Sequence, residues 1–334
     1  MRVLLTGGAG FIGANLVACI LSHTDWQITI LDRLDHSGNL NRLAETGAHN
    51  NPRVRFMFHD LRATMNDQVV QQIGKHDYIL HLAAGTHVDR SITDPMAFVL
   101  DNVVATCNIL EFARKADCRR FIQFSTDEVF GPAPDGVKYK ENDRYNSGNP
   151  YAATKAGAEE LAVSYHNTYG LPVIVTHTMN VYGPLQHYEK YIPSTIGKVL
   201  TGERVLIHAD ATKTKPGSRF YIHAQDVAAA MVFLLKHGAV GEKYNLVGEK
   251  ESSNLEIAMS IGQILGKPVN YELISWHASR PGHDLRYALD GGKMEELGWR
   301  HSLTLEKGLA ETINWYRENP AWLPSPSASA SAAA

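Results

Sequence analysis

Two carboxylic acids stand side by side at Asp127 and Glu128, in the stretch "STDEVFGP" (125–132). The stretch follows an apolar segment typical of a buried strand and ends in a Gly-Pro turn. Adjacent carboxylates in such a place often cap a helix or solvate a turn. Carboxyl groups in different environments can also serve as general acid and general base on one small molecule. The rest of the sequence decides between these two interpretations.

A second pair, Tyr151 and Lys155 in "YAATK", is spaced by four residues, which places both side chains on one face of a helix. A tyrosine beside an ammonium group and a positively charged nicotinamide ring loses its proton more readily, because positive charge favours the phenolate. Such a tyrosine can accept a hydroxyl proton while a hydride leaves the same carbon. In isolation the spacing is typical of a surface pair, so this interpretation requires a cofactor site nearby.

A glycine-rich turn near the N-terminus predicts that cofactor site. In "VLLTGGAGFIGANLV", glycines 7, 8, 10 and 13 lie between a predicted strand and a predicted helix, and Asp32 ends the second predicted strand. Glycines at this spacing let the backbone approach a pyrophosphate at a helix N-terminus, and the acidic residue holds ribose hydroxyls. A carboxylate at Asp32 repels a 2′-phosphate, so NAD is favoured. The neighbouring Arg33 leaves NADP open as an alternative.

Two later strand ends extend the predicted site, although each alone is equally consistent with packing. "HDL" follows the third predicted strand, where the adenine edge could bind, and "HLAAGT" ends the fourth with small residues. The predicted NAD-binding residues are Gly7, Gly10, Phe11, Ile12, Gly13, Asp32, Asp60, Leu61, Ala83, Ala84, Ser125, Tyr151 and Lys155.

Short β-rich runs alternate with longer amphipathic stretches through the first half of the chain. Strands are expected at 3–6, 27–31, 54–58, 78–82, 120–125 and 172–177. This alternation predicts an α/β fold of the Rossmann type, a doubly wound parallel sheet with helices on both faces. We expect an NAD-binding domain over 1–183, and over 184–323 a smaller C-terminal α/β lobe that mainly binds substrate. The chain is expected to return to the main sheet after 184, and the small-residue tail 324–334 is expected to be disordered.

Composition narrows the class of protein. The 334 residues are 44% hydrophobic and 20% charged, with a formal net charge of −3. The chain has no excess of basic residues, so we expect it to bind neither nucleic acid nor a membrane surface. It has no apolar run long enough to predict a membrane span. Because the first strand is predicted to begin at residue 3, we expect no signal peptide. Three scattered cysteines form no CxxC pair, so we expect neither disulfides nor a metal site, and a cytoplasmic location.

Taken together, "TGGAGFIG", "HLAA", "STDEVFG" and "YAATK" resemble the extended short-chain dehydrogenase/reductase family. The similarity is greatest to nucleotide-sugar 4,6-dehydratases, in particular those that act on dTDP-glucose, and it runs from about residue 1 to 322. "THVDRSI", "NVYGP", "EKYIP" and "RPGHDLRYALD" support it. The adjacent Asp-Glu pair and the Arg-Pro-Gly-His-Asp stretch are more specific to dehydratases than the glycine turn or the Tyr/Lys pair.

The resemblance implies a reaction and a role for each catalytic residue. The sugar C4 is oxidised, water is eliminated across C5–C6, and hydride returns to C6, so that an NDP-hexose becomes an NDP-4-keto-6-deoxyhexose. By resemblance, Tyr151 takes the 4-hydroxyl proton, Thr126 hydrogen-bonds the same oxygen and Lys155 lowers the tyrosine pKa. Asp127 is then the acid and Glu128 the base of the elimination. The implied substrate-binding residues are Thr86, Asn180, Lys190, Arg219, Arg280 and His283.

The sequence departs from the dehydratase pattern in three places. Gly85 and Thr86 stand where the family usually has a glutamate and a serine, and Phe130 stands where tyrosine is usual. Segment 205–221 is longer and carries lysines, where the family has a shorter turn that contacts the nucleotide base. The identity of the base therefore stays open at this point.

Two other functions remain as alternatives, and one assembly is implied. A nucleotide-sugar 4-epimerase or decarboxylase could use the same frame, as could a non-catalytic nucleotide-binding protein. In the family, helices like those carrying "MAFVLDNVVATCNILEFARKA" and "YAATKAGAEELAVSYHNTYG" form a four-helix dimer interface. The resemblance therefore implies that the protein is a homodimer. It also implies that the protein binds a nucleotide sugar as its substrate.

Overall fold

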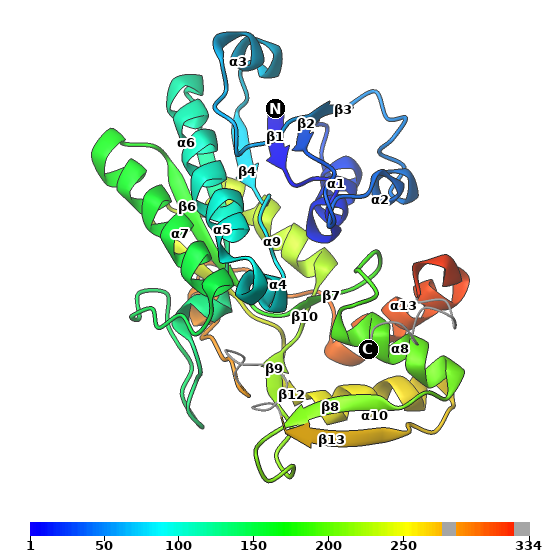
Figure 1. The fold of residues 1–334 in the computed structure, drawn as a ribbon. Helices are drawn as coiled ribbons and strands as arrows, with labels where there is room; N and C mark the ends of the chain where they lie inside the picture. The colour runs from blue at the N-terminus through cyan, green and yellow to red at the C-terminus, as the bar shows by residue number, and fades with distance from the viewer. Residues whose placement is uncertain (276–284, 324–334) are drawn as a thin grey trace.

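The computed structural model describes residues 1–275 and 285–323. Its main element is a seven-stranded parallel sheet in the order β11-β6-β5-β4-β1-β2-β3 (Figure 1). The strands are β1 (Arg2–Thr6), β2 (Gln27–Asp32), β3 (Val54–Phe58), β4 (Tyr78–His81), β5 (Arg120–Thr126), β6 (Val173–Thr178) and β11 (Lys243–Leu246). The predicted Rossmann-type sheet is confirmed, and all six predicted strands are present.

Helices cover both faces of this sheet because its central strands are apolar on both sides. On one face lie α1 (Phe11–His23) and α9 (Ala224–His237); on the other lie α6 (Ala105–Ala116) and α7 (Pro150–Tyr169). Side chains alternate along a strand. In β1, therefore, Val3 and Leu5 join the first core cluster while Leu4 joins the second.

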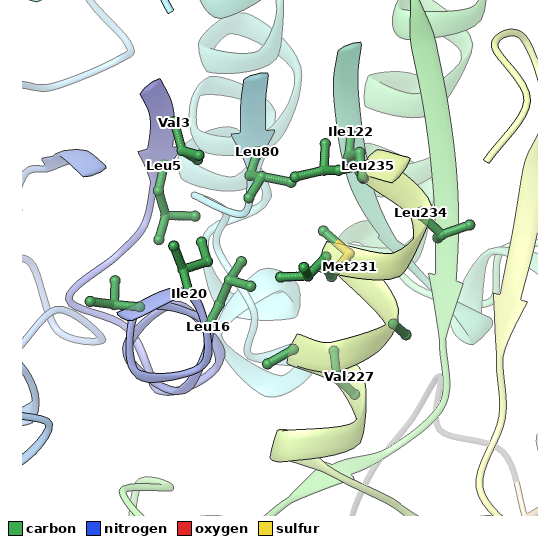
Figure 2. Packing of buried hydrophobic residues seen from close by; sticks show 14 of the residues in the cluster. Val3, Leu5, Leu16, Ile20, Leu80, Ile122, Val227, Met231, Leu234 and Leu235 are labelled. Carbon is green, nitrogen blue, oxygen red and sulfur yellow. The ribbon is translucent and has the colours of Figure 1, made fainter. Parts of the chain in front are cut away.

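Figure 2 shows the first of these clusters. Leu5, Leu80 and Ile122 come from three neighbouring strands. Leu5 lies near Leu16 and Ile20 of α1, and Ile122 lies beside Leu235 of α9. Met231, Leu234 and Leu235 of α9 complete the cluster, and every one of these side chains is buried. Because α9 comes late in the chain, this core ties the second half of the sequence to the nucleotide-binding sheet.

One helical stretch, Pro95–Ala116, changes its winding part-way along. It consists of α5 (Pro95–Phe98), a π-helical segment η1 (Val99–Val104) and α6. A π segment inserts a residue into the helical register and is frequent at functional sites. Pro95–Ala116 is also the one helix in the described chain that is long and apolar enough to cross a membrane, by length and composition only. Buried helices of soluble proteins pass the same test, and α6 packs its apolar face on the sheet.

Most of the elements that follow β6 in the chain form a smaller lobe beyond the carboxyl ends of the strands (Figure 1). Its two-stranded sheets pair β7 (Val181–Tyr182) with β10 (Ile222–His223), β9 (Ser218–Phe220) with β12 (Glu251–Ser253), and β8 (Val205–Ala209) with β13 (Tyr271–Ser275). Its helices are α8 (Tyr191–Thr201), α10 (Asn254–Leu265) and α13 (Leu305–Glu318), which share a separate apolar cluster. The short helices are α2 (Leu40–Glu45), α3 (Asp67–Ile73), α4 (Val88–Thr93), α12 (Gly292–Glu296), η2 (Asp127–Phe130) and η3 (Pro320–Trp322).

Candidate active site

A pocket at the carboxyl ends of β1, β2, β4 and β5 brings most of the predicted site residues together. Parallel sheets bind ligands at this edge, where the strand order reverses. The predicted NAD-binding residues all line the pocket: Gly7, Gly10, Phe11, Ile12, Gly13, Asp32, Asp60, Leu61, Ala83, Ala84, Ser125, Tyr151 and Lys155. Thr126, Asp127, Glu128, Thr86, Asn180 and Lys190 line the same pocket.

The glycine turn is a close fit of backbone on backbone. Gly7 has φ +73°, a conformation that favours glycine, and a Cβ there would lie 2.7 Å from the amide nitrogen of Ala83. A Cβ on Gly13 would lie 2.2 Å from the carbonyl oxygen of Gly7. Helix α1 begins directly after Gly10, so its unpaired N–H groups point from this turn. A cradle without side chains at a helix N-terminus fits the pyrophosphate of a dinucleotide.

Asp32 lies at the end of β2 with both carboxylate oxygens held by the backbone. Oδ2 accepts a hydrogen bond from Ala9 N at 3.0 Å, and Oδ1 accepts one from Leu34 N at 2.9 Å. Burial raises the pKa of Asp32, and the two N–H groups oppose that rise. The carboxylate is thus fixed in place at the position where a ribose would bind.

The neighbouring Arg33 is engaged by acidic side chains. Its Nη1 donates to Asp101 Oδ1 at 2.6 Å and its Nη2 to Asp101 Oδ2 at 2.8 Å. Its Nε donates to Asp35 Oδ2 at 2.8 Å, and Asp60 lies 3.6 Å from Nη1. Asp101 first, and then Asp35, raise the pKa of Arg33. The guanidinium is therefore already engaged by three carboxylates of the protein.

The Asp127–Glu128 pair forms the first turn of η2, directly after β5. Thr126 caps this turn: its hydroxyl accepts from Glu128 N at 3.3 Å and donates to Asp127 Oδ1 at 3.0 Å. Asn149 Nδ2 donates to Glu128 Oε2 at 3.2 Å. Asp127 is only 4% exposed, which contradicts a purely solvated turn. Its Oδ2 is buried and has no hydrogen-bond partner among the described residues.

Aromatic packing behind the pair holds the turn in place. Phe130 is fully buried, stacked on Tyr139 and in edge contact with the rings of Tyr145 and His177. The next residue, Gly131, has φ +73°, and a Cβ there would lie 2.3 Å from a backbone oxygen. The phenyl ring of Phe130 fills the space between these rings without a hydroxyl group. Phe130 can therefore pack at the position where the family usually has tyrosine.

Burial changes the protonation of both carboxyl groups. It is the largest cause that raises the pKa of Asp127 to about 6 and that of Glu128 to about 7. Glu128 rises further because the charge of Asp127 lies beside it. Like charges this close disfavour double ionisation, so near neutral pH the pair holds one proton between its two members. The order of the two pKa values is the reverse of the predicted roles, which place the proton on Asp127.

Tyr151 and Lys155 lie one turn apart on α7, as the spacing predicts, and both are buried. Lys155 Nζ donates to the carbonyl oxygen of Phe124 at 2.6 Å, and burial lowers the pKa of Lys155 to about 8. The pKa of Tyr151 is raised, first by burial and then by the charge of Glu128. The expected lowering of the tyrosine pKa by Lys155 is thus not produced by the protein alone. It depends on the positive nicotinamide ring that the prediction included.

The predicted substrate residues separate into three groups. Thr86, Asn180 and Lys190 line the pocket. Arg219 is not among the lining residues, but its charge lowers the pKa of both Asp127 and Glu128. The guanidinium of Arg219 lies over the ring of Tyr287, 4.5 Å from its centroid, and Nη1 donates to the carbonyl of Ser218. Arg280 and His283 lie outside the described residues.

One group of metal-ligating side chains occurs at the pocket rim. In the described chain, ligand atoms of His36, His187 and Glu189 lie within 4.8 Å of one another. Lys190 lies close enough to lower the pKa of His187, and Arg90 lies 3.5 Å from Glu189. These two cations oppose the binding of a metal ion.

Comparison with known proteins places this pocket in a family. A family model described as GDP-mannose 4,6 dehydratase matches residues 4–312. The chain belongs to the GDP-mannose 4,6 dehydratase family. Among its curated relatives, the dTDP-glucose 4,6-dehydratase of Salmonella typhimurium is 37% identical, over 97% of this chain and 94% of the relative. The low-salt glycan biosynthesis protein Agl12 of Haloferax volcanii is 40% identical, over 95% and 98%.

Solved structures agree with this family assignment. DesIV, a dTDP-glucose 4,6-dehydratase from Streptomyces venezuelae with NAD and TYD bound, superposes with a TM-score of 0.88 at 37% identity, covering 97% of this chain and 99% of DesIV. The UDP-glucose 4-epimerase of Thermus thermophilus, in complex with NAD, reaches a TM-score of 0.83 at 27% identity, with 95% and 99% covered. The fold is therefore shared with epimerases, and the dehydratases are more similar in sequence.

Two residues at the site of this family member were missed by sequence reasoning. Asn149, the partner of Glu128, also caps α7 through its Oδ1, with Pro150 at the first helical position. The "NP" before "YAATK" is a recognisable helix start that could have identified it. Asp101 lies on η1, and the signal there was weaker: a polar Asp-Asn pair inside an otherwise apolar helix.

Proposed function

We propose that this member of the GDP-mannose 4,6 dehydratase family is an NAD-dependent nucleotide-sugar 4,6-dehydratase that acts on dTDP-glucose. The observation that carries the proposal is the Asp127–Glu128 pair, set in the pocket wall with raised pKa values for both members. An enzyme that only oxidises and reduces C4 needs one proton acceptor, which Tyr151 supplies. The second acid–base pair is required only if water is eliminated.

The pocket fits NAD through features of this chain. The glycine cradle would hold the pyrophosphate on α1, and Asp32 would accept from the ribose hydroxyls. Ala83 and Ala84 leave room for the dinucleotide along the end of β4. When bound, NAD accepts hydride from C4 and returns it to C6, so it is regenerated in each turnover.

Tyr151 is the residue we assign to proton removal from the 4-hydroxyl group. Its own surroundings raise its pKa, so deprotonation requires added positive charge on the pocket side. Lys155 is fixed one helical turn away, and Thr126 interacts with the tyrosine side chain in a way that lowers its pKa. The Thr126 hydroxyl has one hydrogen, which Asp127 Oδ1 accepts in this structure. To hydrogen-bond the substrate oxygen as the resemblance implies, it would turn from Asp127 to that oxygen while Tyr151 accepts the proton of the 4-hydroxyl group.

Asp127 and Glu128 then divide the elimination between them. Once C4 is a ketone, the C5 proton is acidic; one carboxylate removes it while one carboxylic acid protonates the departing C6 hydroxyl. A pair that shares one proton contains both groups at once. In keeping with the family resemblance, we assign Asp127 as the acid and Glu128 as the base. This assignment requires the shared proton to lie on Asp127 when substrate is bound. Asp127 Oδ2 has no hydrogen-bond partner among the described residues, so it can carry that proton.

The nucleotide sugar would lie between the main sheet and the smaller lobe. We assign Thr86 to the sugar side, and Asn180, Lys190 and Arg219 to the diphosphate, because amide and cationic groups can donate to phosphate oxygens. Arg280 and His283 remain proposed on the resemblance alone. We also propose 1–183 as the main NAD-binding domain and 184–323 as mainly substrate-binding. Strand β11 and helix α9 then belong to the first domain in space.

We further propose a cytoplasmic homodimer with no membrane or nucleic-acid partner. Apolar side chains of α5 and η1 face solvent in the single chain: Met96 is 64% exposed, and Val99 and Leu100 are also exposed. A contiguous exposed apolar surface favours contact with a second copy, here through Pro95–Ala116 and α7 of each chain. Light scattering should give a dimer mass, and Met96→Glu with Leu100→Glu should shift it to a monomer. A monomeric native protein would contradict this assembly.

Incorporation of deuterium from the solvent into the sugar distinguishes the role of Asp127 from that of Glu128. It also distinguishes a dehydratase from an epimerase. In D₂O with dTDP-glucose, Asp127→Asn should return substrate carrying deuterium at C5, because the base still removes that proton. Glu128→Gln should return substrate without it. Exchange in Glu128→Gln but not in Asp127→Asn would reverse the two roles, and unimpaired turnover in both variants would favour the 4-epimerase.

A further inference from the structure

The end of the pocket where adenosine would bind contains a cluster of charged side chains, with more carboxylates than ribose binding requires. Four carboxylates, Asp32, Asp35, Asp60 and Asp101, line the pocket together with Arg33. Asp32 alone suffices to accept hydrogen bonds from ribose hydroxyls. The other three carboxylates all contact Arg33, and one of them comes from the far side of the pocket, on η1.

We propose that Asp101 is a specificity residue that makes the pocket select NAD over NADP, by holding Arg33 away from the position of a 2′-phosphate. The proposal rests on the proposed NAD site and adds to it a residue far from the glycine turn. An arginine next to the ribose-binding acid is the side chain that accommodates the 2′-phosphate in NADP-binding proteins of this fold. In this chain that arginine is present, so its availability, together with the repulsion by Asp32, determines how strongly the pocket prefers NAD.

The contact between Arg33 and Asp101 is the strongest geometry available to these groups. Both oxygens of Asp101 accept, at 2.6 and 2.8 Å, from the two terminal nitrogens of Arg33. Paired parallel hydrogen bonds of this kind are stronger and more directional than single ones. The Asp101 side chain is 12% exposed and that of Arg33 22%, so water screens the pair only weakly. Asp35, which also contacts Arg33, is 44% exposed and is a weaker partner.

The side chain of the neighbouring Asn102 anchors the π segment that carries Asp101. The next residue, Asn102, is buried and bonds both polar backbone atoms of Gly85: Oδ1 accepts from Gly85 N at 2.8 Å, and Nδ2 donates to Gly85 O at 3.2 Å. Nδ2 also donates to Thr154 on α7 at 2.9 Å. The π segment thus has one side chain locked to the end of β4 and another directed at Arg33. A partner anchored in this way loses little freedom when it holds the guanidinium.

A 2′-phosphate could use Arg33 only by displacing Asp101. It would bring nearly two negative charges to a place with four carboxylates. It would also leave the half-buried Asp101 carboxylate without its paired hydrogen bonds, with only the more distant Arg62, 3.9 Å away, as a cationic neighbour, which is unfavourable. The 2′-hydroxyl of NAD requires neither change. Asp101 therefore discriminates between the two dinucleotides by repelling the wrong one and by occupying the group that would bind it.

Competition between the two dinucleotides tests the proposal without measuring turnover. The purified full-length protein is incubated with an equimolar excess of NAD and NADP, separated from free ligand and denatured, and the released dinucleotides are quantified. The wild type should retain NAD. Asp101→Asn, which keeps size and removes charge, should raise the NADP:NAD ratio by about 10- to 100-fold, the range of a charge-assisted hydrogen bond. Asp101→Thr should shift the ratio in the same direction.

Arg33 supplies the decisive second variant. Arg33→Ala alone should not raise the ratio, and Arg33→Ala added to Asp101→Asn should abolish the gain. Asp25→Asn, the same charge change at an exposed position away from the pocket, is the matched control and should leave the ratio unchanged. An unchanged ratio in folded Asp101→Asn and Asp101→Thr, or a gain that persists without Arg33, would overturn the proposal. If the wild type retained no dinucleotide, the proposed NAD site itself would fail.

Discussion

Replacing Glu128 with glutamine should make the folded protein more stable above neutral pH, although it removes a proposed catalytic group. Burial raises the pKa of this carboxyl from 4.5 to about 7 in the folded protein. The folded state then holds the proton more tightly than the unfolded chain, so stability falls as the pH rises from about 4.5 to about 7. Above pH 7 the full penalty is present. A shift of about 2.5 pKa units corresponds to about 3 kcal/mol.

Glutamine keeps the shape and the hydrogen bond from Asn149 but carries no charge at any pH. We therefore expect the free energy of unfolding of Glu128→Gln to exceed that of the wild type by about 2–3 kcal/mol at pH 8. The difference in the free energy of unfolding between Glu128→Gln and the wild type should nearly vanish at pH 4.5. At that pH the glutamic acid of the wild type and the glutamine of the variant are both neutral in the folded state. The gain is an upper value, because the structure around the charge relaxes in part.

Urea unfolding at pH 4.5 and pH 8 measures this difference, with NAD held in equal excess because bound ligand adds its own stabilisation. Glu311→Gln on the exposed face of α13 is the matched control and should show no pH-dependent gain. A Glu128→Gln protein that is less stable than the wild type at pH 8 would contradict the reasoning. So would an equal difference at both pH values, because the effect would then not come from the charge.

Three further outcomes follow from the same geometry. Tyr151→Phe should slow C4 oxidation by about 10²- to 10⁴-fold while dTDP-glucose still binds, measured as the first-turnover absorbance of reduced nicotinamide; an undiminished signal would exclude Tyr151 as the proton acceptor. Gly13→Ala should lose bound NAD, because the new Cβ would lie 2.2 Å from a backbone oxygen. The control Gly157→Ala, whose Cβ would have its nearest contact at 3.5 Å, should retain NAD. Equal NAD content in both variants would contradict the proposed role of the glycine turn in binding the pyrophosphate. The turnover rate should fall on both sides of a narrow pH optimum. Below about pH 6 the Asp127–Glu128 pair is fully protonated and has no base, and above about pH 7 it is fully ionised and has no acid. A rate that stays constant from pH 5 to pH 9 would argue against a shared proton in this pair.

The main sheet was predictable because its signals are local. Each of the six strands expected in the first half of the chain is an apolar run followed by small or polar residues at its carboxyl end. The π segment was not predictable, because the apolar pattern of Pro95–Ala116 reads as one continuous α-helix. Its different winding depends on packing against α7 and the end of β4, which no local pattern encodes.

The site was predictable where chemistry and spacing coincide and not where it depends on distant contacts. The glycine turn, Asp32 and the Tyr151–Lys155 pair are each set by one short stretch. The partner of Arg33 lies 68 residues away in sequence, and its choice of Asp101 needs the folded pocket. The pKa order of Asp127 and Glu128 likewise depends on burial, and it came out opposite to the order that the predicted roles require.

The proposed elimination can be tested directly by the mass of the product. The purified protein, with only the NAD it retains, is incubated with dTDP-glucose and with UDP-glucose, and the nucleotide sugar is analysed by mass spectrometry and by alkaline absorbance. We predict many turnovers of dTDP-glucose to a product lighter by one water, with no net formation of NADH. A product of unchanged mass, or reduced nicotinamide formed in proportion to product, would contradict the account.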